Sequence, residues 1–159
     1  MTIIRLTCLI KLTMKTLIGE YTHKLDPKFR VSLPSKIRSV IGEVVIVTKG
    51  LDGCAYVYSE SEWQLITENL QAMSLGQTSA RALNRYILSA AVEVAIDKSG
   101  RILLPEPIRN TAKLDNQVVI AGVGNRLELW NPEAWATQQQ RLIAEIDDIA
   151  ETLGSIYQI

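Results

Sequence analysis

The sequence predicts an α+β fold in which two tandem repeats, each mostly β, interleave into one pseudo-symmetric β-barrel with flanking helices and a C-terminal helix. The thirteen residues DPKFRVSLPSKIR at 26–38 return as DKSGRILLPEPIR at 97–109, with six identical positions. An apolar run, a Gly-bearing turn, an alternating strand and a Trp-bearing helix start follow each copy. A unit of roughly 45 residues is too small to build its own core, so we expect the two units to share one.

The composition is that of a globular protein. Apolar residues make up 47% of the 159 residues and charged residues 21%, and 17 basic residues balance 17 acidic ones. A zero net charge argues against a nucleic-acid binder, although a local basic patch can be offset elsewhere. Two cysteines without C-x-x-C spacing and a single histidine argue against a disulfide framework or a zinc site. We therefore expect no metal site, and we also expect no cofactor and no small-molecule substrate.

The first fifteen residues are expected to lie outside the folded body. The stretch 1–18 is apolar, but Arg5 and Lys11 interrupt it and no small-residue cleavage site follows, so we do not expect a secretory signal. No apolar run in it reaches the roughly 18 residues that a membrane span needs. Met14 offers an alternative start, and we expect residues 1–15 to be a disordered extension or a start-site artefact.

Each unit begins with a strand, a turn and a second strand. Alternating residues predict the first strand at 19–25 and again at 91–96. The Asp-x-x-x-Arg segment that follows predicts a turn, because Asp accepts backbone N–H groups there, and Gly100 permits a positive φ. The second strands are predicted at 30–33 and 101–104. A proline ends each, since proline cannot donate to a sheet.

Helices close each unit and connect the two. The capping box from Ser59 to Glu62 predicts one helix start. Asn131 as N-cap, with Pro132 at the first helical position, predicts the long C-terminal helix. Apolar residues on one face of 80–91 predict a helix that links the units rigidly. The predicted division is an N-terminal extension 1–15, a first unit 19–64, linking helices 65–90, a second unit 91–136 and a C-terminal helix 137–159.

The zero net charge conceals a basic first hairpin and an acidic last helix. Residues 23–38 contain five Lys and Arg against one Asp, whereas residues 131–159 contain five acidic residues against one Arg. Basic side chains neutralise phosphates, and Arg can pair with guanine in the major groove, which admits a two-stranded ribbon. The first hairpin is therefore a candidate DNA-binding element.

These motifs resemble a known family. Each copy has Asp-x-x-x-Arg, then an alternating strand that ends in Leu-Pro, then Ile-Arg. This order is similar to the swapped-hairpin AbrB-type DNA-binding unit. Two copies in one chain, introduced by GEYTH at 19–23 and joined by ARALNRYILSAAVEVAID at 80–97, resemble the bacterial MraZ family. The resemblance covers nearly all of the chain after the first fifteen residues. It implies a double AbrB-type, swapped-hairpin β-barrel.

The resemblance also implies a function. The chain would be a non-enzymatic, sequence-specific repressor of the division and cell-wall gene cluster in which its own gene lies. It would act in the cytoplasm at the nucleoid, as a ring-like homo-oligomer bound to short direct repeats in promoter double-stranded DNA. The predicted DNA-binding residues are Arg30, Lys28, Lys24, Arg101 and Lys98, and the predicted motif-turn residues are Asp26, Asp97 and Gly100.

Several of these residues have a structural alternative. Arg30 could instead form a surface ion pair with Asp26, and the lysines could be solvated surface residues. We expect Arg38 and Arg109 to form structural or inter-subunit ion pairs. The family pattern has Gly directly before the motif Arg, but the first copy has Phe29, so either the first turn has another shape or Phe29 makes contacts of its own. The tryptophans are expected in the core; they are Trp63, Trp130 and Trp135.

Two other functional classes remain open. The long C-terminal helix, with an acidic face and an apolar stripe, is also typical of an oligomeric protein-interaction module or an antitoxin-like partner binder. A small hydrolase that uses Cys54 and His23 is a remote third hypothesis, because no orienting or oxyanion motif accompanies them.

Overall fold

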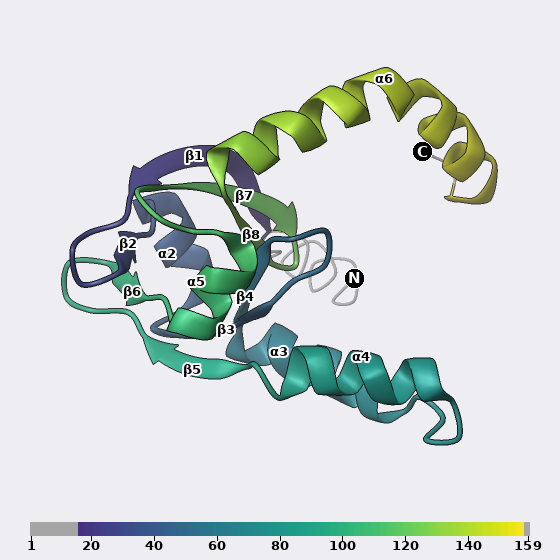
Figure 1. The fold of residues 1–159 in the computed structure, drawn as a ribbon, viewed down its shortest axis with the longest axis horizontal. Coiled ribbons are helices and arrows are strands. Elements are labelled where there is room, and N and C mark those ends of the chain that lie inside the picture. Colours follow the sequence, from purple (N-terminus) through teal and green to yellow (C-terminus); the bar gives the residue numbers. More distant parts are fainter. Residues whose placement is uncertain (1–15, 158–159) are drawn as a thin grey trace, which may run out of the picture.

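The computed structural model describes residues 16–157, and the predicted extension 1–15 lies outside the described residues. The fold is α+β (Figure 1). The strands are β1 (Leu17–Lys24), β2 (Arg30–Ser32), β3 (Val44–Lys49), β4 (Ala55–Ser59), β5 (Val92–Ala95), β6 (Arg101–Leu103), β7 (Gln117–Gly124) and β8 (Leu127–Trp130). The helices are α2 (Ser35–Ile41), α3 (Glu60–Gln71), α4 (Thr78–Leu88), α5 (Glu106–Ala112) and α6 (Pro132–Tyr157).

The two units exchange strands. The six-stranded antiparallel sheet has the order β1-β7-β8-β4-β3-β5, and β2 pairs with β6 in a separate two-stranded sheet. Thus β1 of the first unit pairs with β7 of the second, and β5 of the second pairs with β3 of the first. The order is symmetric when equivalent strands of the units are exchanged. The predicted barrel is not closed, however, because β1 and β5 are opposite edges of an open sheet.

Two short helices were not predicted. Both α2 and α5 begin directly after the Leu-Pro dipeptide, with Pro34 and Pro105 at the N-cap positions. From the sequence, these prolines were expected only to end the preceding strands. The apolar residues that the two helices bury are Ile37, Ile41, Ile108 and Ala112, each pair four residues apart. That spacing places both members on one helix face against the core, which stabilises helices of only two turns.

The longer helices begin where their caps predict. The Ser59 hydroxyl accepts the Glu62 N–H at 3.3 Å at the start of α3. The Asn131 side chain accepts the N–H groups of Glu133 and Ala134 at the start of α6. The linking helix α4 is anchored to the sheet, because buried Thr48 donates to the carbonyl of Ile87 at 2.6 Å. No helix in the described part of the chain combines the length and apolarity needed to cross a lipid bilayer.

The core has two parts. The larger one packs the inner sheet face against α2, α5 and the β2–β6 pair. A smaller aromatic cluster covers the other face and includes the three tryptophans, of which Trp130 is buried and Trp63 and Trp135 are half-buried. The Trp135 indole N–H donates to Glu20 at 2.8 Å. The tryptophans therefore pack as the sequence predicts.

The projections of the molecule lie away from the repeated motif. Figure 1 shows the β1–β2 and β5–β6 turns together at one end of the body. The α3–α4 pair and the long α6 extend from the other end. The two copies of the motif thus form one surface, separate from the acidic C-terminal helix.

Candidate nucleic-acid interface

The first motif turn, residues 26–30, is built around one carboxylate. Asp26 Oδ1 accepts the backbone N–H groups of Lys28 and Arg30, each at 2.9 Å. Backbone bonds close the turn, from Phe29 N–H to the Asp26 carbonyl and from Asp26 N–H to the Arg30 carbonyl. The Asp-x-x-x-Arg spacing is therefore the spacing at which a single side chain can satisfy the donors that the turn leaves unpaired.

The second motif turn, residues 97–101, repeats this geometry. Asp97 Oδ1 accepts the N–H groups of Ser99 and Arg101 at 2.9 Å. The Gly100 N–H donates to the Asp97 carbonyl at 2.9 Å. The replacement of Gly by Phe29 in the first copy has therefore not changed the shape of the turn.

The second oxygen of each aspartate holds the motif arginine. Arg30 Nε lies 2.8 Å from Asp26 Oδ2, and Arg101 Nε lies 2.9 Å from Asp97 Oδ2. Longer contacts cross between the turns, from Arg30 Nη1 to Asp97 at 3.9 Å and from Arg101 Nη1 to Asp26 at 3.6 Å. These four residues, which we call the Arg–Asp quartet, join the two motif turns into one charged cluster.

Hydrogen bonding keeps the quartet ionised. The pKa of Asp26 is lowered from its ordinary value, first by the backbone N–H of Arg30 and also by its guanidinium, against a smaller opposing effect of burial. The pKa of Asp97 is lowered in the same way by Arg101. The arginine side chains are only partly exposed, at 28% for Arg30 and 32% for Arg101. The quartet is therefore neutral overall, with its arginines held in fixed orientations.

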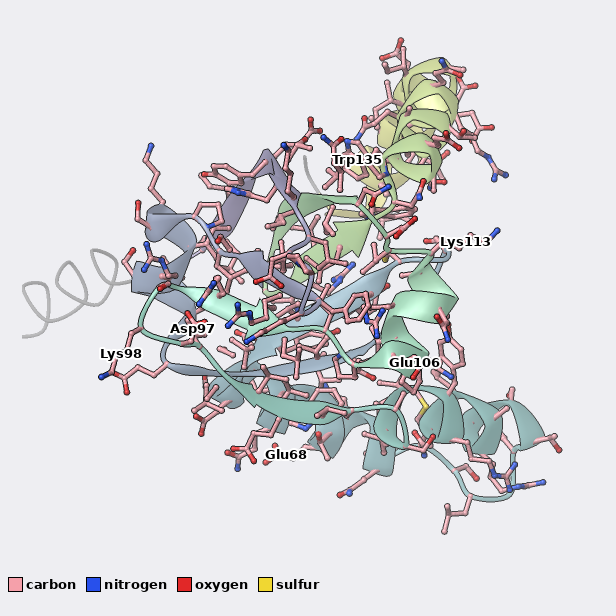
Figure 2. The ribbon with its side chains drawn as sticks, turned by 60° about the vertical axis from the view of Figure 1, so that its left-hand side comes forward. Glu68, Asp97, Lys98, Glu106, Lys113 and Trp135 are labelled. Atoms are coloured by element: carbon pink, nitrogen blue, oxygen red, sulfur yellow. The ribbon has the colours of Figure 1, made fainter. Side chains whose placement is uncertain are left out.

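The uncompensated positive charge lies beside the quartet. Lys24 ends β1, Lys28 lies in the first motif turn and Lys98 in the second, and all three are exposed. Figure 2 shows Lys98 projecting outward beside Asp97. None of the three lysines forms an ion pair with another residue of the range 16–157. They are therefore placed to attract an anionic polymer.

Each motif turn also receives an arginine from the helix of the other unit. The Arg109 guanidinium stacks on the Phe29 ring, with its central carbon 3.5 Å from the ring centre, and donates from Nε to the Leu104 carbonyl at 2.9 Å. Arg38, the equivalent residue of the first unit, lies against Gly100, where an added Cβ would be 2.5 Å from its Nη1. Nothing in the sequence pattern predicted that each arginine would contact the motif turn of the other unit.

The expected ion pairs of these two arginines are not found within the described chain. Neither Arg38 nor Arg109 pairs with a carboxylate of residues 16–157. Their partners are a glycine and an aromatic ring, because the exchange of strands brings each α2 or α5 arginine next to the opposite motif turn.

The hypothetical hydrolase pair has the wrong chemistry. Cys54 is buried and donates to the Leu51 carbonyl, and burial raises the pKa of its thiol to about 12. Little thiolate is therefore present at neutral pH, and the thiolate is the nucleophilic form. His23 lies on β1, paired with Val118. Residues 16–157 contain no cluster of three or more His, Cys, Asp or Glu side chains placed to hold a metal ion.

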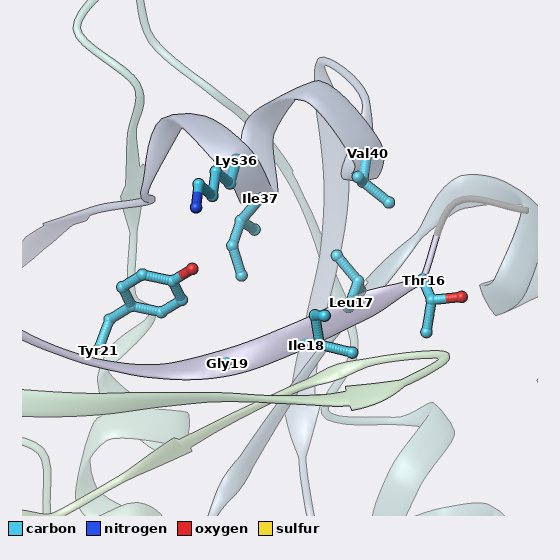
Figure 3. Close-up of a pocket in the computed structure, with 8 residues that line it drawn as sticks. All are labelled: Thr16, Leu17, Ile18, Gly19, Tyr21, Lys36, Ile37 and Val40. Carbon is cyan, nitrogen blue, oxygen red and sulfur yellow. The ribbon is translucent and has the colours of Figure 1, made fainter.

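One pocket lies between β1 and α2. It has a volume of about 210 Å³ and is mainly apolar, with the Tyr21 hydroxyl and the Lys36 amine among its polar groups (Figure 3). The lining residues are Thr16, Leu17, Ile18, Gly19, Tyr21, Lys36, Ile37 and Val40. This set contains no nucleophile paired with a base, so the pocket does not form a catalytic site of that kind.

Comparisons with known proteins point to one family. Residues 16–86 and 87–154 each match the family described as "MraZ protein, putative antitoxin-like". A protein of Heliobacterium modesticaldum named transcriptional regulator MraZ is 41% identical over 136 residues, which cover 86% of this chain and 95% of the relative. Relatives with the same name from Caldanaerobacter subterraneus and Limosilactobacillus reuteri are 42% and 43% identical, over 87% of this chain and 97% of each relative.

Proposed function

This chain belongs to the MraZ family of transcriptional regulators, and from that premise we propose that it is a repressor that binds promoter DNA through its two motif turns. The observation that carries the proposal is the Arg–Asp quartet, which fixes both motif arginines side by side on one surface. A rigid pair of arginines flanked by free lysines is suited to a duplex, where bases are recognised by oriented donors and phosphates by charge.

The quartet prepares the arginines for base recognition. Each guanidinium uses Nε to bind its aspartate and keeps only a long contact at Nη1. The Nη2 groups of Arg30 and Arg101 have no hydrogen-bond partner among the described residues. A side chain that is already oriented loses less rotamer entropy on binding, and two amino groups on one guanidinium can contact guanine O6 and N7.

The lysines supply the phosphate contacts in this proposal. We assign this role to Lys24, Lys28 and Lys98, which are exposed and have no acidic partner among the described residues. Each phosphate that is neutralised adds about −0.9 to the slope of log affinity against log salt. Three such contacts per chain make the affinity of an oligomer steeply dependent on salt.

We also propose the finer features that the family resemblance implies. The two AbrB-type units comprise residues 19–64 and 91–136, and their exchanged β1–β2 and β5–β6 segments correspond to swapped hairpins. A ring-like homo-oligomer binds direct repeats and represses the division and cell-wall gene cluster, in the cytoplasm at the nucleoid. Exposed apolar residues on α6 are suited to assembly; they are Ile143, Ile146, Leu153 and Ile156.

The decisive experiment is binding to the chain's own upstream promoter region at two salt concentrations, with wild type and Arg30→Ala. Loss of one bidentate base contact should weaken binding roughly ten- to hundredfold. Arg141→Ala is the matched control, because Arg141 is an exposed arginine of α6 whose only ion pair within residues 16–157 is a 3.9 Å contact to Glu145. Circular dichroism and size-exclusion chromatography must show that both variants keep the fold and oligomer size. Equal binding by wild type and both variants would exclude Arg30 from the interface.

The α6 surface supports a second candidate function. An exposed helix with an acidic face and an apolar stripe also fits an oligomeric protein-interaction module or an antitoxin-like partner binder. In that case the wild type would bind promoter DNA weakly or without salt dependence. It would instead form a stable complex with a protein partner, and substitutions on α6 rather than at the motif turns would break that complex.

A further inference from the structure

The two motif turns are equivalent in backbone and different at one side chain. Phe29 and Gly100 occupy the same position, directly before the motif arginine, and both have positive φ, at 60° and 79°. The same hydrogen bonds close both turns. Gly100 shows that the turn needs no side chain here, so the Phe29 ring is not required to build it.

Phe29 has a backbone conformation that is unfavourable for a residue with a bulky side chain. A bulky residue in the left-handed region is a steric outlier, whereas glycine adopts it freely. Phe29 is also 42% exposed, in a motif turn whose other side chains are mostly charged. The second motif turn avoids this strain by having glycine at the equivalent position. A strained residue at the candidate DNA surface therefore motivates a functional hypothesis for the Phe29 side chain.

The ring is held in a fixed position. Arg109 covers one face at 3.5 Å and is itself anchored by its bond to the Leu104 carbonyl. The Leu104 N–H in turn donates to the Phe29 carbonyl at 2.9 Å. Each of Phe29, Leu104 and Arg109 therefore contacts the other two. The Arg109 guanidinium lies over the ring, and the residue remains partly exposed between Lys28 and Arg30 in the chain.

We propose that Phe29 is a specificity-determining residue that contacts the C5-methyl group of a thymine in the major groove, with Arg109 as its positioning residue. This inference rests on the proposed DNA-binding function. Phosphates and most base-edge atoms require donors or acceptors, and the thymine methyl is the apolar group that the major groove offers to an apolar side chain. A ring fixed beside a base-reading arginine can make that contact without losing further freedom.

The contact would make the two motif turns unequal in the DNA that they prefer. Two identical motif turns related by the pseudo-symmetry of the fold would favour a symmetric DNA sequence. Phe29 in one turn and Gly100 in the other remove that equivalence. A chain that prefers a thymine on one side only would bind an asymmetric site in one orientation.

The test compares the same promoter DNA prepared with thymine or with deoxyuridine, which lacks only the C5-methyl group. Wild type should bind the deoxyuridine DNA more weakly, roughly fourfold for each methyl contact, from the transfer free energy of one methyl-sized group. Phe29→Gly should bind both DNAs with equal affinity. This variant keeps the fold, because glycine is the residue best suited to the local φ of 60°.

A second variant tests the positioning role. Arg109→Lys keeps the charge but removes the planar stack, so it should lose most of the preference for thymine while keeping salt-dependent binding. Equal loss of affinity by wild type and Phe29→Gly on deoxyuridine DNA would overturn the assignment of Phe29 but leave the proposed function intact. So would a wild type that does not distinguish the two DNAs. A wild type that binds neither DNA would overturn the proposed function, and the inference with it.

Discussion

At the scale of single residues, the two oxygens of one carboxylate have separate roles. Oδ1 of Asp26 and of Asp97 accepts backbone N–H groups and shapes the motif turn. Oδ2 binds the guanidinium of the motif arginine. The same ionised group thus builds the turn and orients the side chain that we propose to contact DNA. The ion pair requires the carboxylate to be deprotonated, and the backbone hydrogen bonds are stronger when it is.

The pH dependence of stability follows from this requirement. Because the pKa of both aspartates is lowered in the folded chain, their contribution is fully present above the ordinary Asp value of 3.8. It is lost as the pH falls through the folded pKa. We expect the free energy of unfolding, measured with urea, to decline below about pH 4.

A double variant isolates this contribution. Asp26→Asn with Asp97→Asn should be less stable than wild type at neutral pH and should show a shallower acid decline. Asp147→Asn, an exposed substitution on α6, is the control and should follow wild type. An acid decline as steep in the double variant as in wild type would contradict the assignment.

At the scale of elements, a few buried contacts determine how each helix or strand is attached. The linking helix α4 is fixed to β3 by the buried Thr48 hydroxyl and by Tyr86, whose hydroxyl donates to the Gly50 carbonyl at 2.9 Å. The edge strand β1 is attached to β7 over eight residue pairs. Different substitutions test these two attachments.

Thr48→Val should weaken the attachment of α4. Valine has the same shape but cannot donate to Ile87, so the carbonyl loses a buried partner. We expect a loss of about 1–2 kcal/mol in the free energy of unfolding. Thr152→Val is the matched control, since Thr152 donates to the Asp148 carbonyl on an exposed helix face where water can replace it. Comparable losses in both variants would show that burial is not the cause.

Gly122→Ala should displace the edge strand β1. A Cβ at this position would lie 2.5 Å from the backbone nitrogen of Ile18, and a strand backbone cannot move aside as a side chain can. Overpacking of this kind costs roughly 1–3 kcal/mol in urea unfolding. Gly76→Ala, whose Cβ would meet only Ser74 Oγ at 3.5 Å, should be nearly neutral. A neutral Gly122→Ala would mean that β1 is loosely attached.

At the scale of the whole molecule, the two units share one hydrogen-bonded framework. Their strands pair with each other at β1–β7, β3–β5 and β2–β6, and the main core cluster contains residues of both. Removing the second unit would leave β1 and β2 without their strand partners, and removing the first would do the same to β5 and β6. The two units therefore repeat in sequence, but they are not independent folding units.

We expect the chain to unfold in a single cooperative transition. Trp63 lies in the first unit, whereas Trp130 and Trp135 lie in the second, so tryptophan substitutions can separate the two signals. The Trp63→Phe variant keeps only the tryptophans of the second unit, so its fluorescence reports on that unit. The double variant Trp130→Phe with Trp135→Phe keeps only Trp63, so its fluorescence reports on the first unit. Within each variant, fluorescence and circular dichroism should give coincident urea transitions. A fluorescence transition separate from the far-ultraviolet signal in either variant would show that the units unfold independently.

Features that depend on residues close together in the chain could be predicted from the amino-acid sequence. The motif turns, the caps at Ser59 and Asn131 and the pairing of Arg30 with Asp26 join residues at most four positions apart, so their spacing is visible in the chain. How the two copies meet could be seen only in the folded chain. The open sheet, the quartet contacts between the motif turns and the stack of Arg109 on Phe29 join residues from different units. No local pattern specifies such contacts, because they arise from strand exchange, through which each unit completes the core of the other.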